Sequence, residues 1–134
     1  MTIRAVADTH TVIWYTFADS RLSPTARAEM DAAVANGEQI AISSISLAEM
    51  VYLVEKGRIG VMIYEGVIAA LEEQNPLLLN IACDRAVVQA MWHVSRNEVP
   101  DFPDRIVAAT AMYLRVPLIS RDRKIQASSV TTIW

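Results

Sequence analysis

The sequence has very little cysteine: Cys83 is the single one among 134 residues. One cysteine permits neither an internal disulfide nor a cysteine-based zinc site, so we expect the reducing environment of the cytoplasm. Only four glycines occur, and their spacing gives no phosphate-cradling loop. Long apolar runs are missing too, since none approaches the roughly 20 residues that a membrane span needs. The opening MTIRAVADTH also lacks the pattern of a signal peptide.

An excess of basic charge is also absent. The formal net charge is -3 and the isoelectric point is about 5.3, which argues against a broad basic surface that binds bulk nucleic acid. The same charge is compatible with an enzyme that gathers carboxylates around a metal and uses a few local arginines for phosphates. Hydrophobic residues make up 53% of the chain, which excludes disorder, and the length fits one domain over residues 1–134.

Short β-branched apolar runs alternate with longer amphipathic segments along the chain. This rhythm predicts an α/β fold, with a short, mostly parallel sheet between two layers of helices. The expected strands are 3–7, 39–43, 76–81, 117–120 and 130–133. The expected helices are 9–17, 24–36, 46–56, 60–74, 84–96 and 103–114. The helices at 46–56 and 60–74 are strongly apolar, and an exposed stripe on them would be available to another chain.

Four acidic residues stand just beyond predicted strands or in the helices that follow loops. Asp8 directly follows the first strand, and Asp122 lies two residues past the strand that begins at Pro117. Glu49 and Asp104 fall near the starts of two predicted helices. Because ligands of open α/β sheets bind beyond the C-terminal ends of the strands, we expect the four carboxylates to meet at one edge.

Such a cluster points to a hard divalent cation. Two like charges about 4 Å apart cost on the order of 4 kcal/mol at an effective dielectric of 20, so the fold must retain protons or bind cations there. Oxygen ligands without histidine or thiolate suit Mg²⁺ or Mn²⁺. These metals activate water and stabilise a phosphate under in-line attack, so the pattern favours a phosphodiester hydrolase.

Each acid also has an ordinary structural role open to it. Ser46 and Glu49 match a capping box, in which Glu49 would only satisfy the backbone of Ser46. Asp101 is a candidate N-cap for the next helix. Asp8 and Asp122 are suited to turns. The convergence of all these residues on one edge is what favours a site.

Several basic residues flank the acids, with phosphate binding and charge neutralisation as their two open roles. They are Arg105, Arg121, Arg123 and Lys124. The two histidines, His10 and His93, are separate in the sequence and are expected to be structural. No Ser/His/Asp or Cys/His arrangement for nucleophilic catalysis is visible.

Five blocks resemble those of VapC-type PIN domains, in the same order and over nearly the whole chain. They are ADTH at 7–10, RLSP at 21–24, ISSISLAEM at 42–50 with KGRI at 56–59, DFPDRIVAATA at 101–111 and LISRDRKI at 118–125. Two details differ from the usual pattern: Pro103 stands one place later, and Ser120 replaces the commoner threonine. Neither difference removes an acid.

The resemblance implies a PIN-like three-layer domain that hydrolyses RNA with metal-activated water. In it Asp8, Glu49, Asp104 and Asp122 occupy the acidic pocket, with Mg²⁺ or Mn²⁺ chiefly on Asp8 and Asp104. The accessory residues would be Asp101, with Thr9 and Ser120 orienting carboxylates or water. It further implies a homodimer and a small VapB-type antitoxin that blocks the pocket.

Three other readings are open to the sequence. A phospho-acceptor signalling module also clusters acids at a sheet edge, but the acidic pair after the first strand and the strand-end lysine are missing here. A non-catalytic module would use the acids to hold a structural cation or a basic peptide. A nuclease directed at DNA is the third, because metal chemistry on a phosphodiester does not itself read the 2′-OH.

Overall fold

A five-stranded parallel sheet forms the centre of the molecule in a computed structural model that describes residues 2–134. The strand order is β3-β2-β1-β4-β5, so the first strand of the sequence is the central one. The strands are β1 (Ile3–Ala7), β2 (Gln39–Ser43), β3 (Leu78–Ile81), β4 (Leu118–Ile119) and β5 (Thr132–Ile133). All four pairings are parallel, so the C-terminal ends of the strands lie at one edge, as the sequence predicts.

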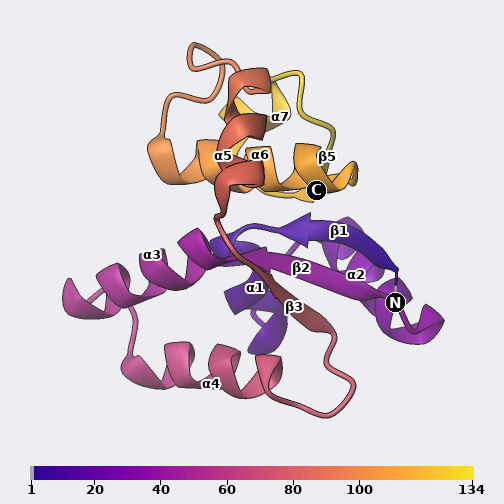
Figure 1. The fold of residues 1–134 in the computed structure, drawn as a ribbon. Coiled ribbons are helices and arrows are strands. Elements are labelled where there is room, and N and C mark those ends of the chain that lie inside the picture. The colour runs from indigo at the N-terminus through magenta and orange to yellow at the C-terminus, as the bar shows by residue number, and fades with distance from the viewer. Residues whose placement is uncertain (1) are drawn as a thin grey trace.

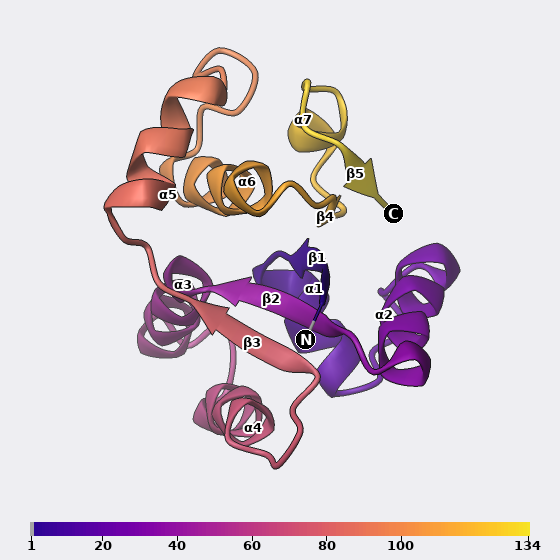
Figure 2. The same ribbon diagram turned by 45° about the vertical axis from the view of Figure 1, so that its right-hand side comes forward.

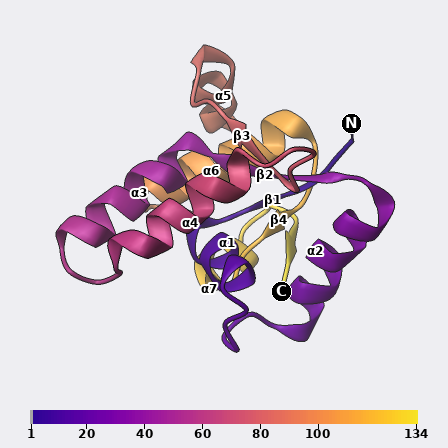
Figure 3. The ribbon, with the colours of Figure 1, turned by 90° about the horizontal axis from the view of Figure 1, so that it is seen from below.

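Helices cover both faces of this sheet, which gives three layers (Figures 1 and 2). The first group is α1 (Thr9–Thr16), α2 (Pro24–Asn36), α3 (Ser44–Glu55) and α4 (Val61–Leu71). The second group is α5 (Arg85–Ala90), the 3₁₀ turn η1 (Met91–His93), α6 (Phe102–Leu114) and α7 (Arg123–Gln126). In Figure 3, α3 and α4 lie side by side, while α2 stands apart at the other end of the sheet.

Two hydrophobic cores, one on each face of the sheet, follow from the alternation of side chains along a strand. In β1, Ala5 and Ala7 pack into the core beneath α1 to α4, and Val6 packs into the core beneath α5 to α7. In β4, Ile119 joins the first core and Leu118 the second. Because both faces are covered, the strands read as continuous apolar runs.

The bounds predicted for the first two strands and for α2 are confirmed. The cap side chain of α2 is Ser23, whose hydroxyl accepts from the backbone N–H of Ala26, and Pro24 opens the helix. The helix ends at Gly37, whose φ of 66° is the left-handed conformation that favours glycine. The later strands and the helices α1, α4 and α5 are shorter than predicted, whereas α3 and α6 begin earlier than predicted.

Two local predictions are wrong, and one short helix was not predicted. The third helix begins at Ser44 with Ser43 as its cap, so the capping box expected from Ser46 does not exist. The helix after Asp84 ends at Ala90 and continues only as the 3₁₀ turn. A four-residue helix, α7, was not expected, although its cap Asp122 accepts from Ile125 N–H in the usual N-cap pattern. Within the described chain no helix is long and apolar enough to span a membrane.

Candidate active site

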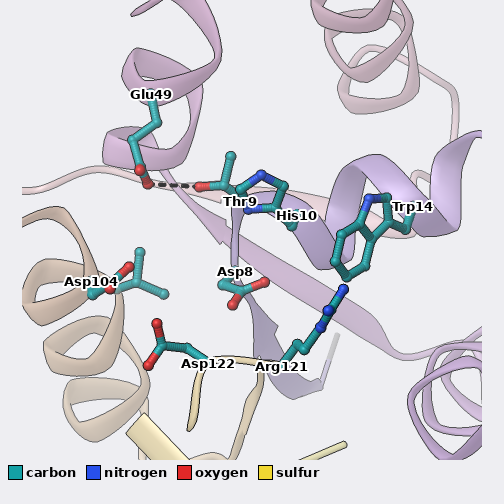
Figure 4. A pocket seen from close by; sticks show the side chains of 9 residues that line it. Asp8, Thr9, His10, Trp14, Glu49, Asp104, Arg121 and Asp122 are labelled. Atoms are coloured by element: carbon teal, nitrogen blue, oxygen red, sulfur yellow. Dashed lines mark hydrogen bonds between the residues drawn. The ribbon is translucent and has the colours of Figure 1, made fainter. Parts of the chain in front are cut away.

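The four predicted acids line one cavity of about 460 Å³ beyond the C-terminal ends of β1 and β4. Figure 4 shows Asp8, Asp104 and Asp122 pointing into the same space, with Glu49 reaching it from α3. Four segments that are far apart in the sequence therefore supply the lining. Three of these segments follow the C-terminal ends of β1, β2 and β4, and the fourth, which carries Asp104, is the start of α6, which follows η1 and a loop.

Asp8 is held by hydrogen bonds on both of its carboxylate oxygens. It caps α1: Oδ1 accepts from the backbone N–H of Thr11 at 3.0 Å and lies 2.7 Å from the Thr11 hydroxyl. Oδ2 accepts from the hydroxyl of Ser120 at 2.5 Å. The turn function considered from the sequence is thus present, as a helix cap. It fixes the carboxylate toward the cavity.

Glu49 is bound by Thr9 and not by the start of its own helix. The Thr9 hydroxyl donates to Glu49 Oε1 at 2.8 Å, across 40 positions of sequence. Burial raises the pKa of Glu49, the Thr9 hydrogen bond opposes that rise, and the negative charge of Asp101 adds to it. Because the helix starts before Ser46, Glu49 lies in its second turn and is free of capping duty.

Asp104 sits in the first turn of α6, half-buried and facing the other acids. Burial is the main reason that its pKa rises to about 7, and the charges of Asp101, Asp122, Glu49 and Asp8 add to the effect. Within residues 2–134 the structure gives no hydrogen bond to its carboxylate oxygens. A cation in the cavity would relieve this penalty by favouring the ionised form.

Asp101 caps α6, as expected from the sequence, and accepts from the backbone N–H of Asp104 at 3.0 Å. It lies outside the lining of the main cavity and in that of an adjoining one. The fully buried Ser120 connects Asp8 with Asp122. Its hydroxyl donates to Asp8 and accepts from the backbone N–H of Asp122 at 3.1 Å.

An aromatic and basic wall faces the acids across the cavity. Trp14, which is only 5% exposed, lies with its ring centroid 5.5 Å from that of His10 and 5.9 Å from that of Trp134. The guanidinium carbon of Arg121 is 5.5 Å from the Trp14 ring (Figure 4). His10 is exposed on the cavity wall, where its ring lies beside that of Trp14.

Sequence reasoning did not single out Trp14 or the exposure of His10. The available signal was their spacing of four residues on one helix, which places two rings on the same face beside Asp8. The other histidine, His93, is also exposed and lies in a separate hollow with Trp92. Neither histidine is buried in the core.

The flanking basic residues divide into two kinds. The Arg105 guanidinium donates to the backbone carbonyls of Val94 at 3.1 Å and Met91 at 3.0 Å, which ties α6 to η1. Arg121 lines the main cavity. Arg123 and Lys124 line the adjoining hollow, and all three of these side chains are exposed.

A sequence model of the PIN domain matches residues 5–129. The chain belongs to the PIN domain family. No curated protein sequence matches it significantly. PIN domains are generally nucleases, and their members typically use divalent metals.

Two solved structures share the fold of this PIN domain. The crystal structure of VapBC2 from Rickettsia felis, bound to a promoter DNA fragment, is similar over 97% of this chain and 97% of that chain, with a TM-score of 0.70 and 18% identity. The structure of FitAcB from Neisseria gonorrhoeae is similar over 96% and 95% of the two chains, with a TM-score of 0.62 and 22% identity. At these identities the likeness establishes the fold.

The donor set of this PIN domain fits a hydrated Mg²⁺ or Mn²⁺ better than a tightly caged metal. Within residues 2–134, no three His, Cys, Asp or Glu side chains are already gathered as a metal-binding group. Zinc sites of proteins need three or four such ligands. Mg²⁺ instead keeps several waters and is held by one or two carboxylates together with substrate phosphates. Asp8 and Asp104 line one cavity and are oxygen donors of the kind that this mode of binding uses.

Proposed function

We propose that this PIN domain is a metal-dependent endoribonuclease toxin of the VapC type. The observation that carries the proposal is the convergence of Asp8, Glu49, Asp104 and Asp122 on one open cavity at the sheet edge. The family supports nuclease activity in general. The choice of RNA follows the resemblance of the sequence blocks to VapC-type domains.

The four acids have different roles in this proposal. Asp8 and Asp104 would hold Mg²⁺ or Mn²⁺, and a bound metal would lower the pKa of water and offset the charge of the phosphate. Glu49 and Asp122 orient the attacking water through their carboxylate oxygens. Thr9 and Ser120 keep Glu49 and Asp8 in position through the hydrogen bonds described above.

The basic side chains have different proposed roles. Arg121 and Arg123 bind phosphates of the RNA, because their guanidinium groups reach the two hollows beside the acids. Arg105 has a structural role, since its guanidinium donates both of its hydrogen bonds to backbone carbonyls. Asp101 acts as an accessory acid by capping α6 and by adding negative charge near Asp104.

We also propose a homodimer and a VapB-type antitoxin as partners in the cytoplasm. The apolar helices α3 and α4 expose Val51, Tyr52, Val61 and Met62, which offers a surface for another chain. The two similar structures, VapBC2 and FitAcB, are toxin–antitoxin complexes. Light scattering of the purified chain, alone and with its partner, measures both associations.

The deciding experiment is cleavage of total small RNA by the purified chain with Mg²⁺, with Mn²⁺ and with EDTA. Discrete fragments that need metal are expected, and Asp104→Asn should reduce their rate by on the order of 100-fold or more. The matched control is Glu73→Gln, an exposed acid in the turn after α4, which should cut normally. A DNA strand of the same sequence tests the sugar preference.

Three outcomes redirect the proposal. Equal cleavage of DNA and RNA supports a general nuclease of the same fold. Cleavage that survives Asp104→Asn places the activity outside this cavity. No cleavage under any metal condition favours a non-catalytic binding module.

A further inference from the structure

Asp104 and Asp122 lie between two neighbouring hollows on the surface. The main cavity, of about 460 Å³, contains Asp104 and Asp122 in its lining together with the Trp14 wall. A second hollow of about 370 Å³ is lined by the same two aspartates and continues over Pro100 toward Arg123. The two aspartates therefore form a wall common to both spaces.

Basic side chains lie in both hollows, and the β4–α7 connection together with the start of α7 supplies them. Arg121 precedes Asp122, the N-cap of α7, and Arg123 is the first residue of that helix. Arg121 lines the main cavity, whereas Arg123 and Lys124 line the second hollow. Among the described residues no ion pair involves any of the three side chains.

Arg121 is held in place by an aromatic ring. Its guanidinium lies over Trp14, which is buried and backed by Trp134, so the arginine is preorganised without losing its charge. Arg21 also lies over Trp14, at 5.2 Å, but it is neutralised by a salt bridge to Asp19 at 2.8 Å. Arg121 is thus the arginine on this ring whose charge faces the cavity.

We propose that a single strand of RNA crosses the acidic wall from one hollow to the other, with a phosphate on one side bound by Arg121 and a phosphate on the other side bound by Arg123 and Lys124. This inference rests on the proposed function and adds the path of the substrate. The bond over the acids has nucleotides on both sides, so the site cuts within a strand and needs both flanks. Cations beyond the acids offset the repulsion between the carboxylates and the RNA backbone.

A binding experiment tests the path without relying on cleavage. A fluorescent 12-nucleotide single-stranded RNA is titrated, in EDTA, with the full chain carrying Asp104→Asn. The logarithm of its binding constant falls with the logarithm of the salt concentration, by about 0.7 in slope for each phosphate contact. Arg121→Gln and Arg123→Gln should each reduce that slope by about 0.7, and the double variant by about 1.4.

The matched control is Arg115→Gln, at the opposite end of α6 from Asp104, which should leave the slope unchanged. A slope for Arg121→Gln or Arg123→Gln equal to that of the control overturns the path. If the slopes change as expected but the unmodified chain cuts no RNA, the path stands and the nuclease assignment fails. If the chain cuts RNA and the slopes do not change, the nuclease assignment stands and the path fails.

A second experiment assigns the two sides. Once the cut position is mapped, the phosphate on either side of it is replaced by a neutral methylphosphonate. A methylphosphonate on one side of the cut should slow cleavage by the original protein and should not slow the Arg121→Gln variant further. A methylphosphonate on the other side should slow the original protein and should not slow the Arg123→Gln variant further. Equal further slowing of both variants by both replacements contradicts separate subsites.

Discussion

Asp8 and Asp104 face the same cavity, yet the protein treats the two carboxylates in opposite ways. Asp8 receives hydrogen bonds on both oxygens, from Thr11 and Ser120. The carboxylate of Asp104 receives none in the described part of the chain, and burial among acids raises its pKa to about 7. The fold stabilises the ionised carboxylate of Asp8, whereas burial and the neighbouring acids destabilise that of Asp104.

The comparison shows how an acidic site is built without losing the fold. One carboxylate is preorganised by donors, so its position does not depend on a ligand. The other is left unsatisfied and gains most from an incoming cation. Glu49 is intermediate, because one hydroxyl supports it while burial opposes its ionisation.

The largest effect on stability is expected from Asp104→Asn. Because the pKa of Asp104 in the folded chain, about 7, lies above the ordinary 3.8, the folded state binds the proton more tightly. Its contribution to stability is present at about pH 4 and is lost as the pH rises through about 7. In EDTA the variant should gain about 2 kcal/mol at about pH 8, after discounting for solvent screening, and nothing at about pH 4.

Urea unfolding of both chains at the two pH values measures this gain. Glu73→Gln serves again as the control and should show no difference between them. An equal gain at both pH values would mean that Asp104 acts through packing and not through its charge.

Asp8→Asn is expected to lower the free energy of unfolding, by a smaller amount than Asp104→Asn raises it. Sequence reasoning alone predicts a chain as stable as the original or slightly more so, because one member of a repulsive cluster is removed. The hydrogen bonds from Thr11 and Ser120 change that expectation, since an amide replaces a charged acceptor. The variant should lose about 1 kcal/mol in urea unfolding at about pH 8.

Combining Asp8→Asn with Ser120→Ala should cost less than the sum of the two single changes, because both remove the same hydrogen bond. Full additivity, or a gain in stability from Asp8→Asn, contradicts the proposed support of this carboxylate.

The smallest effect on stability is expected from a change next to Glu49, the carboxylate with a single supporting hydroxyl. Thr9→Val removes the hydroxyl that donates to Glu49 and keeps the shape of the side chain. Since that bond lowers the pKa of Glu49, the pKa should rise further, while stability changes by less than about 1 kcal/mol. An NMR titration of the Glu49 carboxyl carbon measures the shift, and Thr9→Ser should restore the original value. An unchanged pKa of Glu49 in Thr9→Val would show that the Thr9 hydroxyl does not stabilise the Glu49 carboxylate.

Much of the fold could be predicted because the decisive signals are local. The strand at Ile3–Ala7 is a short apolar run, and α2 carries both a serine cap with proline and a terminal glycine. These residues act through the backbone next to them, so the sequence suffices. The family resemblance rests on the same local blocks and placed the acids in the right elements.

The errors came from contacts between distant segments. Glu49 matches a capping box in sequence, but its partner is Thr9, 40 positions away. His10 looks like an ordinary helix residue, yet the cavity on its exposed side depends on α6 and the β4–α7 turn. The short helix α7 has too few residues for periodicity to reveal it.

The hydrogen bond between Ser120 and Asp8 spans 112 positions of the chain. Contacts of such long separation form late in folding, because most of the chain must first be ordered around them. At about 5–20 residues per second, synthesis takes on the order of 10 s to proceed from one partner to the other. Throughout that interval the emerging chain lacks Ser120 and the last of the four acids, Asp122, so the proposed RNA cleavage is delayed until the far end of the sheet has been made.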